Sequence, residues 1–319
     1  MSRPLVTTFF DRIHAHPLFR RHGRKAIIVI PYAWLVVFFL TPFLIILQIS
    51  ASEGEMFPYA PLLRFHDGVA TLSLHVNHYF SLVSDRLYRT TYLSSMGYAA
   101  LTTLWCLFVG YPFAYFMARA KPSSQPALLM MVMLPFWTSF LLRVYAWKGL
   151  LMDDGWISRL LVALNADGIL LRLGFLEAPG KFMNTPFSLV IGMVYTYLPF
   201  MVLPLYATLS KMDLRLLEAA ADLGATPWVA FWRITVPLSK AGIIAGSMLV
   251  FIPCIGEYVI PEMLGGPRTL MIGKVLWEEF FSNNDWPMAS SVAVVVILVI
   301  IVPLALFNKY QAEATEATT

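Results

Sequence analysis

The chain has 319 residues, of which 58% are hydrophobic and 13% are charged, and its formal net charge is +4. Soluble domains carry about 45–50% apolar and about 25% charged residues, so a water-soluble core cannot absorb this much apolar surface. The apolar residues stand in long blocks rather than in short alternating runs, which favours an all-α integral membrane protein over an outer-membrane barrel.

The cysteines and the positive charge fit this class. Cys106 and Cys254 both lie inside apolar blocks, so they predict neither a disulfide framework nor a metal cluster, and we expect lipid-facing or packed thiols. The basic residues gather in tails and loops beside apolar blocks, which indicates membrane topology rather than nucleic-acid binding.

Six apolar stretches are each long enough to cross about 30 Å of hydrocarbon, which takes about 20 helical residues. They predict a cytoplasmic tail over residues 1–25, a six-helix transmembrane domain over 26–307 and a cytoplasmic tail over 308–319. We expect the first stretch to stay as an anchor, because it is longer than a cleaved signal peptide. The predicted spans are 26–49, 92–118, 127–151, 187–209, 241–264 and 286–307.

The orientation follows from where Lys and Arg stand between the spans. Thirteen of the 23 basic residues fall in the tails and in the shorter connections on one side, and eight fall in the longer connections on the other. Positive residues concentrate on the cytoplasmic side, so both termini are predicted to be cytoplasmic. Arg143 and Lys148, at the outer end of the third span, run against this trend. The long outer connections, 50–91 and 152–186, contain turn clusters and are expected to form short interfacial helices.

The connection over residues 211–240, called the coupling loop below, predicts two short helices with a sharp joint. Asp213 is placed to cap the first helix, and Gly224 suits a left-handed end. Thr226 followed by Pro227 is a start signal for a second helix, which Pro237 is expected to close. The first helix has an apolar side made of Leu216, Leu217, Ala220, Ala221 and Leu223.

The same loop resembles the Glu-Ala-Ala loop of type I ABC importer permeases. In that pattern the triplet is followed after three residues by Gly, and after nine more by Ile-x-hydrophobic-Pro. The matching positions are Glu218, Ala219, Ala220, Gly224, Ile234, Val236 and Pro237. The resemblance implies that these residues form a coupling helix that docks in a groove of the ATPase subunit.

The resemblance also implies the assembly. A second homologous permease, two ATPase subunits docking on the coupling loop, a periplasmic binding protein and membrane lipid are the expected partners, in a bacterial inner membrane. The sequence contains no Gly-x4-Gly-Lys-Ser/Thr nucleotide loop, and the stretch 266–274 has the wrong spacing for one. We therefore expect the partner ATPase to use ATP and Mg²⁺, while this chain binds no cofactor and no metal and has no catalytic residue.

Three further stretches resemble the polyamine branch of these permeases, and the putrescine permeases most of all. They are 134–147, 256–266 and 285–290, and the resemblance extends over residues 23–307. It implies that the cargo is a polyamine, delivered by a periplasmic polyamine-binding protein.

Four residues are candidates for the substrate path: Glu257, Tyr258, Trp137 and Tyr145. Glu257 is predicted to lie within the fifth span, where an ionised carboxylate costs about 2.5–3.5 kcal/mol, so a function such as attracting an ammonium group is expected of it. The rings of the other three, like those of Trp147, Tyr195 and Tyr197, could each stabilise a cation. The alternative for any ring is helix packing or an interfacial belt, and for Glu257 it is a polar pair with the partner permease or an outer basic group.

Two other functions stay open at this point. The same machine could carry an organic anion, since Arg143, Lys148 and Arg268 could serve one. An ion-coupled secondary carrier or a membrane-embedded enzyme is disfavoured, because the sequence has no His-Glu-x-x-His site and no carboxylate pair on one face of a span.

Overall fold

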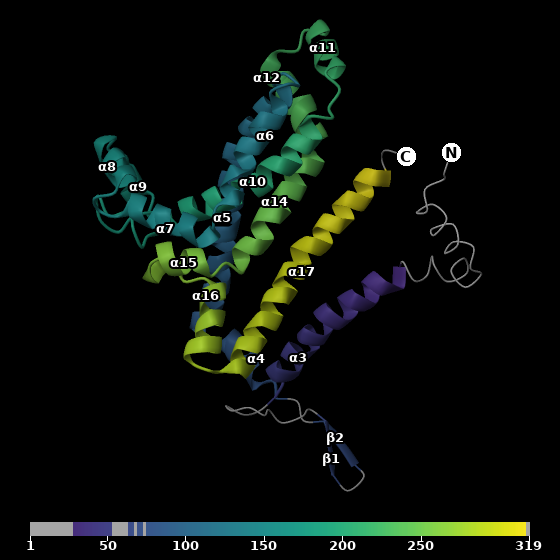
Figure 1. Cartoon of the computed structure of the whole chain (residues 1–319), viewed down its shortest axis with the longest axis vertical. Helices are drawn as coiled ribbons and strands as arrows, with labels where there is room; N and C mark the ends of the chain where they lie inside the picture. The colour runs from purple at the N-terminus through teal and green to yellow at the C-terminus, as the bar shows by residue number, and fades with distance from the viewer. Residues whose placement is uncertain (1–27, 53–62, 67–68, 73–74, 317–319) are drawn as a thin grey trace, which may run out of the picture. The chain divides into compact units, whose positions relative to one another are not determined.

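The computed structural model describes residues 28–52, 63–66, 69–72 and 75–316 (Figure 1). The predicted N-terminal tail, 1–25, lies outside the described residues. The chain divides into two compact units, residues 1–75 and 76–319.

In its described residues, 28–52, 63–66, 69–72 and 75, the first unit contains an apolar helix and a hairpin. The helix covers Ile28–Ser50 and includes a π-helical segment, η1 (Val36–Leu40), followed by α3 (Thr41–Ser50). Its apolar side chains are exposed within the unit, as expected of a helix that faces lipid or another subunit. The strands β1 (Leu63–His66) and β2 (Val69–Leu72) pair antiparallel, with Leu63 opposite Leu72. The expected interfacial helix is therefore wrong for this part of the first outer connection, where β-branched and aromatic residues form a ribbon instead.

The second unit is built around three helices that run side by side (Figure 1). They are α5 (Arg86–Arg119), α10 (Pro186–Leu209) and α14 (Lys240–Ile255). Two glycines let α14 approach α10 closely. A Cβ on Gly242 would lie 2.7 Å from the Thr208 hydroxyl oxygen, and one on Gly246 would lie 2.8 Å from the sulfur of Met201. The two glycines, four residues apart on one face of α14, therefore serve helix packing.

Two of the predicted spans are broken. In place of one helix over 127–151, α6 (Gln125–Met133) and the 3₁₀ segment η2 (Leu134–Trp137) meet α7 (Phe140–Leu151) at an angle of 89°. The break follows Pro135, because Thr138 and Ser139 take extended backbone that no helix can continue.

The predicted fifth span, 241–264, is also too long. Helix α14 ends at Ile255, and α15 (Val259–Leu264) is a separate short helix. A helical stretch before α14, Pro227–Leu238, meets α14 at an angle of 64°. It consists of α12 (Pro227–Ala230), η3 (Phe231–Thr235) and α13 (Val236–Leu238). Among the residues that the structure describes, four helices are long and apolar enough to cross a membrane, or up to six if each bent pair is one span, so the count of six stays a prediction.

Short helices flank the long ones. On the connections predicted to be outer lie α4 (Asn77–Ser84), α8 (Trp156–Ala163), α9 (Ala166–Arg172), η4 (Pro267–Thr269), α16 (Ile272–Trp277) and η5 (Glu278–Ser282). The short helices expected over 152–186 are thus present as α8 and α9, and their place at the membrane interface stays a prediction. The last helix, α17, runs over Trp286–Glu316, so residues 308–316 continue the helix rather than starting a separate tail.

The core lies between α5, α10 and α14 and is made of apolar side chains such as Met193, Met201 and Leu205. Cys106 and Cys254 are both free and buried there, so they are packed thiols. These core contacts pack the three helices against one another as a bundle. One candidate site lies at each end of this bundle.

Candidate functional sites at the two ends of the bundle

The first helix of the coupling loop begins and ends as its sequence predicts. Helix α11 (Arg215–Asp222) starts where the Asp213 carboxylate accepts a hydrogen bond from the Arg215 amide, at 3.0 Å. Gly224 ends it with a φ of +80°, and the amides of Gly224 and Ala225 donate to the carbonyls of Ala221 and Ala220, each at 2.9 Å. This is a Schellman ending, in which the left-handed residue satisfies carbonyls that the helix leaves unpaired.

The second helix starts as predicted but ends later. The Thr226 hydroxyl accepts a hydrogen bond from the Val229 amide at 3.4 Å, and Pro227 occupies the first helical turn. Pro237 does not close the helix, because a proline is tolerated in the first turn of α13, which continues to Leu238. The stop comes at buried Ser239, whose hydroxyl pairs with that of Tyr111 at 2.8 Å.

The loop presents an apolar surface outward. Leu223 is 88% exposed, and Leu216, Trp228 and Trp232 are also largely exposed. Of the predicted coupling residues, Glu218, Ala219, Gly224 and Pro237 are exposed, Ile234 is partly buried and Ala220 is buried. Exposed apolar residues grouped in this way, called the coupling surface below (Leu216, Leu223, Trp228 and Trp232), mark an interaction site when they lie outside the membrane.

Behind the coupling surface is a cavity of about 250 Å³. Leu217, Ala221 and Phe231 line it from the loop and Tyr115 from α5. Thr235, also on its wall, is fully buried, and its hydroxyl has no hydrogen-bond partner among the described residues. The coupling loop therefore packs against α5 with a partly unfilled cavity between them.

At the opposite end of the bundle, Glu257 lies at the break between α14 and α15, not inside a continuous helix. One carboxylate oxygen accepts the hydroxyl hydrogen of Tyr197 from α10. The other accepts the amides of Val259 and Ile260, at 3.1 and 3.4 Å, and so caps α15. The charge of this half-buried carboxylate is stabilised by three donors, which also hold the break in place.

The structure brings Tyr258 into an aromatic stack but leaves Trp137 and Tyr145 apart. The Tyr258 ring lies parallel to that of Trp277, with centroids 4.9 Å apart and 12° between planes. Trp137 and Tyr145 are exposed, and in the described part of the chain neither side chain makes a ring contact or a hydrogen bond. Sequence reasoning missed Trp277, because nothing in the linear order indicates that α16 folds back on the residue after Glu257.

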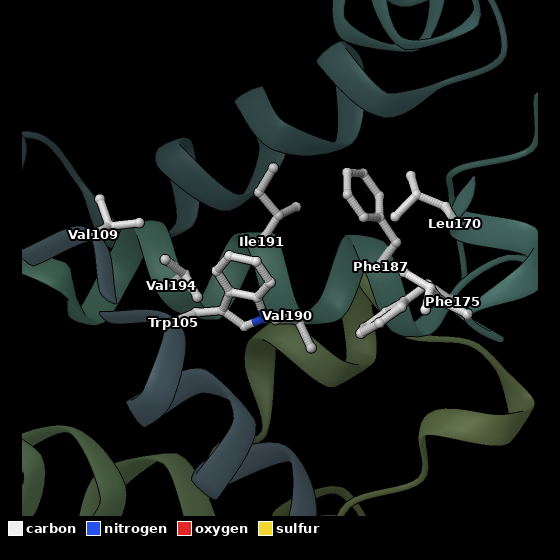
Figure 2. Close-up of a pocket in the computed structure, with 9 residues that line it drawn as sticks. Trp105, Val109, Leu170, Phe175, Phe187, Val190, Ile191 and Val194 are labelled. Carbon is white, nitrogen blue, oxygen red and sulfur yellow. The ribbon is translucent and has the colours of Figure 1, made fainter. Parts of the chain in front are cut away.

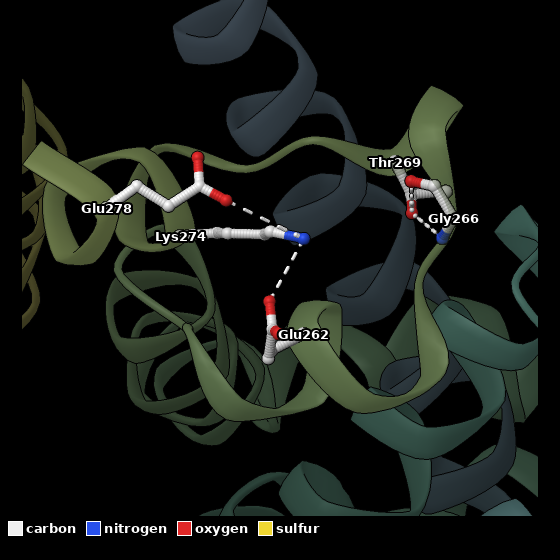
Figure 3. Close-up of polar contacts among 5 residues, drawn as sticks. All are labelled: Glu262, Gly266, Thr269, Lys274 and Glu278. Atoms are coloured by element: carbon white, nitrogen blue, oxygen red, sulfur yellow. Dashed lines mark hydrogen bonds and ion pairs between the residues drawn. The ribbon is translucent and has the colours of Figure 1, made fainter. Parts of the chain in front are cut away.

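Lys274 of α16 lies between two carboxylates that the sequence did not single out (Figure 3). Its Nζ is 3.0 Å from Glu262 of α15 and 3.9 Å from Glu278 of η5. Nearby, Arg268 pairs with Glu177 at 3.2 Å, and Tyr88 of α5 donates its hydroxyl hydrogen to Glu279 at 2.7 Å. This end of the bundle therefore carries several carboxylates with few cations.

Arg143 has a different environment. Its guanidinium lies over the rings of Phe136 and Phe140, 5.6 and 5.8 Å from their centroids. Its buried Nε and Nη1 atoms have no hydrogen-bond partner among the described residues. Such a cation is left to pair with a carboxylate or another acceptor from outside this part of the chain.

A purely apolar cavity can be set aside as a polyamine site. About 380 Å³ in volume, it lies between α5, α9 and α10, where Trp105, Phe175 and Phe187 point into it (Figure 2). No lining residue carries a charge, and an ammonium group loses too much hydration to enter without a partner. No group of three His, Cys, Asp or Glu side chains is arranged for a metal ion in the described ranges.

The ends are one membrane thickness apart along α5. Near its start, the Ser95 hydroxyl accepts the Ile272 amide of α16 at 2.7 Å, and near its finish the Tyr115 ring contacts Phe231 of the coupling loop. Twenty residues separate Ser95 from Tyr115, which at 1.5 Å per residue is about 30 Å. The coupling loop and the acidic, aromatic site therefore lie about as far apart along α5 as a bilayer's hydrocarbon core is thick.

Comparisons with known proteins identify the family of this chain. The model of the family described as "Binding-protein-dependent transport system inner membrane component" matches residues 25–314. The chain belongs to this family. It is a multi-pass inner membrane protein of the ABC importer permease class, and the prediction that it is a translocation subunit rather than an enzyme is confirmed.

Among curated proteins, the permease is 36% identical over 291 residues to the spermidine/putrescine transport system permease protein PotB of Haemophilus influenzae, covering 91% of this chain and 93% of that one. It is 37% identical over 272 residues to the PotB protein of Escherichia coli strain K12, covering 85% and 92%.

Two solved structures share the fold. One is a bacterial ABC transporter involved in the import of alginate, with a TM-score of 0.60, 16% identity and coverage of 91% of this chain and 97% of that chain. The other is a bacterial alginate ABC transporter in complex with a periplasmic protein bound to an alginate pentasaccharide, with a TM-score of 0.63, 15% identity and coverage of 95% and 98%. These likenesses confirm the predicted type I permease architecture.

Proposed function

We propose that this permease is a translocation subunit of an ATP-driven, binding-protein-dependent importer of polyamines, with putrescine as the foremost cargo. The observation that carries the proposal is the identity of more than a third to the two PotB proteins over most of the chain. The carboxylates and stacked rings at the end of the bundle opposite the coupling loop support it, because they suit a multiply charged organic cation.

The coupling loop is proposed to take up force from a separate ATPase. Its two helices are joined at Gly224, Ser239 ends the second one, and its coupling surface exposes apolar side chains. Two ATPase subunits would bind such surfaces on this permease and on a second homologous permease. ATP and Mg²⁺ belong to the ATPase in this proposal, and the permease itself binds no cofactor.

The proposed transport direction sets the orientation. With both termini and the coupling loop in the cytoplasm, the sites around Glu257 and Lys274 face the periplasm, where a polyamine-binding protein would deliver its ligand. Closure of the ATPase would then move the loop and re-aim the helices around a path shared by the two permeases.

Uptake of labelled putrescine and spermidine tests both halves of the proposal. In cells without other polyamine importers, wild-type permease should restore uptake, and Glu218→Lys or Gly224→Asp should abolish it at equal protein level in the membrane. Lys211→Gln, exposed in the same connection but outside both helices, is the matched control and should transport normally. A wild-type permease that restores no uptake refutes the polyamine assignment, whereas active loop variants refute the coupling role.

A second candidate cargo, an organic anion, is favoured by Arg143 alone. Its unpaired Nε and Nη1 atoms would suit a carboxylate group. The ligand of the partner binding protein decides between the two cargoes: an acidic, aromatic cleft fits a polyamine, and an arginine-lined cleft fits an anion.

A further inference from the structure

Lys274 is held in an arrangement that has more negative than positive charge. Figure 3 shows its side chain pointing between Glu262 and Glu278, which it reaches at 3.0 and 3.9 Å. The lysine side chain is 27% exposed, and each carboxylate is 44% exposed. One ammonium thus faces two carboxylates, and this partly desolvated trio keeps a net charge of −1.

The surrounding segment does not supply the missing cation. Residues 256–285 contain five acidic side chains and two basic ones, a net charge of −3 in a chain whose total is +4. The second basic residue, Arg268, already pairs with Glu177 at 3.2 Å. A cation from outside would therefore lower the electrostatic energy of this segment.

Aromatic rings stand beside the trio. Tyr258 and Trp277 stack at 4.9 Å, and Trp277 is also 5.2 Å from Phe281, centroid to centroid. Trp277 directly precedes Glu278 and follows Lys274 by three positions on α16, so the stack borders the charged groups. Ring faces add to the attraction that carboxylates exert on an alkyl ammonium group.

Backbone packing ties this cluster to the break at Glu257. A Cβ on Gly273 would lie 2.5 Å from the carbonyl oxygen of Gly256 and 2.6 Å from that of Glu257. Lys274 is the next residue, so its position is set by the same contact that places α16 against the break. The trio and the carboxylate that Tyr197 holds therefore belong to one rigidly connected region.

The group held in the trio matches the proposed cargo except for one missing ammonium. A lysine side chain is a chain of four methylenes ending in an ammonium, and putrescine is the same four-carbon chain with an ammonium at each end. The structure thus displays an aminobutyl cation bound between Glu262 and Glu278 beside two stacked rings.

We propose that Lys274 is a tethered stand-in for the cargo and a specificity-determining residue of the path. Glu262, Glu278 and the Tyr258–Trp277 stack form a subsite for a primary aminoalkyl group, which Lys274 occupies until a polyamine displaces it. The inference rests on the proposed function. Because one ion pair replaces another, the exchange costs little, and the cargo is held weakly enough to move on.

Binding of labelled putrescine to the purified transport complex, without the binding protein, tests the subsite directly. Lys274→Ala removes the competitor and should tighten binding about fivefold, the effect expected from a partly exposed ion pair. n-Butylamine, the free counterpart of the lost side chain, should compete with putrescine in Lys274→Ala and not in wild type. Adding Glu262→Gln and Glu278→Gln should remove both effects. Arg268→Ala, which breaks the neighbouring pair with Glu177, is the matched control and should change neither.

Three outcomes are decisive. Unchanged putrescine binding and no competition by n-butylamine in Lys274→Ala, at wild-type thermal stability, would show that the trio is only structural. If Lys274→Ala fails to assemble, Lys274→Met is used instead, because methionine keeps an aliphatic chain without the charge. Putrescine binding weaker than in wild type, with no competition by n-butylamine, would overturn the subsite in that variant as well. A wild-type complex that takes up no polyamine refutes the proposed function itself, whereas normal uptake with unaltered binding in the variants refutes only this inference.

Discussion

Gly273 is the residue on which the geometry of the Glu257 region depends most directly. Its α-carbon lies against the carbonyl oxygens of Gly256 and Glu257, where no side chain fits. The sequence singles out Glu257 and Tyr258 together as substrate-path candidates, and that role stays a prediction. It could not reveal that Tyr197, Trp277, Glu262 and Glu278 surround them, because those contacts form only when α10, α15 and α16 fold back on the break.

We expect Gly273→Ala to destabilise the permease by about 1–3 kcal/mol, since a methyl group 2.5 Å from a carbonyl oxygen forces α16 away from the break. Thermal unfolding of the purified protein in detergent measures the loss. Gly97→Ala is the control: its Cβ would meet no atom within 4 Å on α5, and alanine favours helix. Equal unfolding temperatures for the two variants would contradict the close packing.

At the scale of elements, the sequence predicted the capping residues of the coupling loop but not the breaks within the long apolar stretches. Asp213, Gly224 and Thr226 act through neighbouring backbone, so their roles could be predicted from spacing alone. The breaks after Pro135 and Ile255 interrupt runs that stay apolar throughout, and hydropathy carries no information on where such a run bends. The hairpin β1–β2 was missed because the expectation of helices rested on turn clusters rather than on strand-forming residues.

Gly224 allows a test of backbone conformation without side-chain clashes. A Cβ there would meet nothing within 4 Å, so Gly224→Ala carries only the cost of φ at +80°, about 1–2 kcal/mol. We expect faster hydrogen exchange of the amides of α11 in this variant, and lower uptake per ATP hydrolysed. Gly224→Asn is the matched variant, because asparagine tolerates this conformation better, and it should fall between alanine and wild type. Identical exchange in all three proteins would count against the strain.

For the whole molecule, the apolar surface is the part that sequence resolves least. Faces that meet lipid, the second permease or the ATPase are all apolar, so composition identifies the membrane class without assigning each face. Family membership supplies the architecture that composition leaves open, while the orientation and the number of spans still depend on where the charged loops lie.

Cysteine labelling tests the orientation. In a background with Cys106→Ala and Cys254→Ala, a membrane-impermeant maleimide applied to intact cells should label Asp154→Cys, whose side chain is almost fully exposed, because it is predicted to face the periplasm. It should label Leu223→Cys, at 88% exposure, only after the cells are opened. The reverse pattern would invert the topology.

Helix α5 gives this permease a mechanical property beyond its contacts. One uninterrupted helix of 34 residues contacts α16 near one end and the coupling loop near the other. It can act as a lever: a tilt of about 5° about one contact moves the other, about 30 Å away, by about 3 Å. A displacement of that size is larger than the 2.5 Å that would separate a Cβ on Gly273 from the Gly256 carbonyl oxygen, so a small tilt of α5 is enough to change the packing around Glu257.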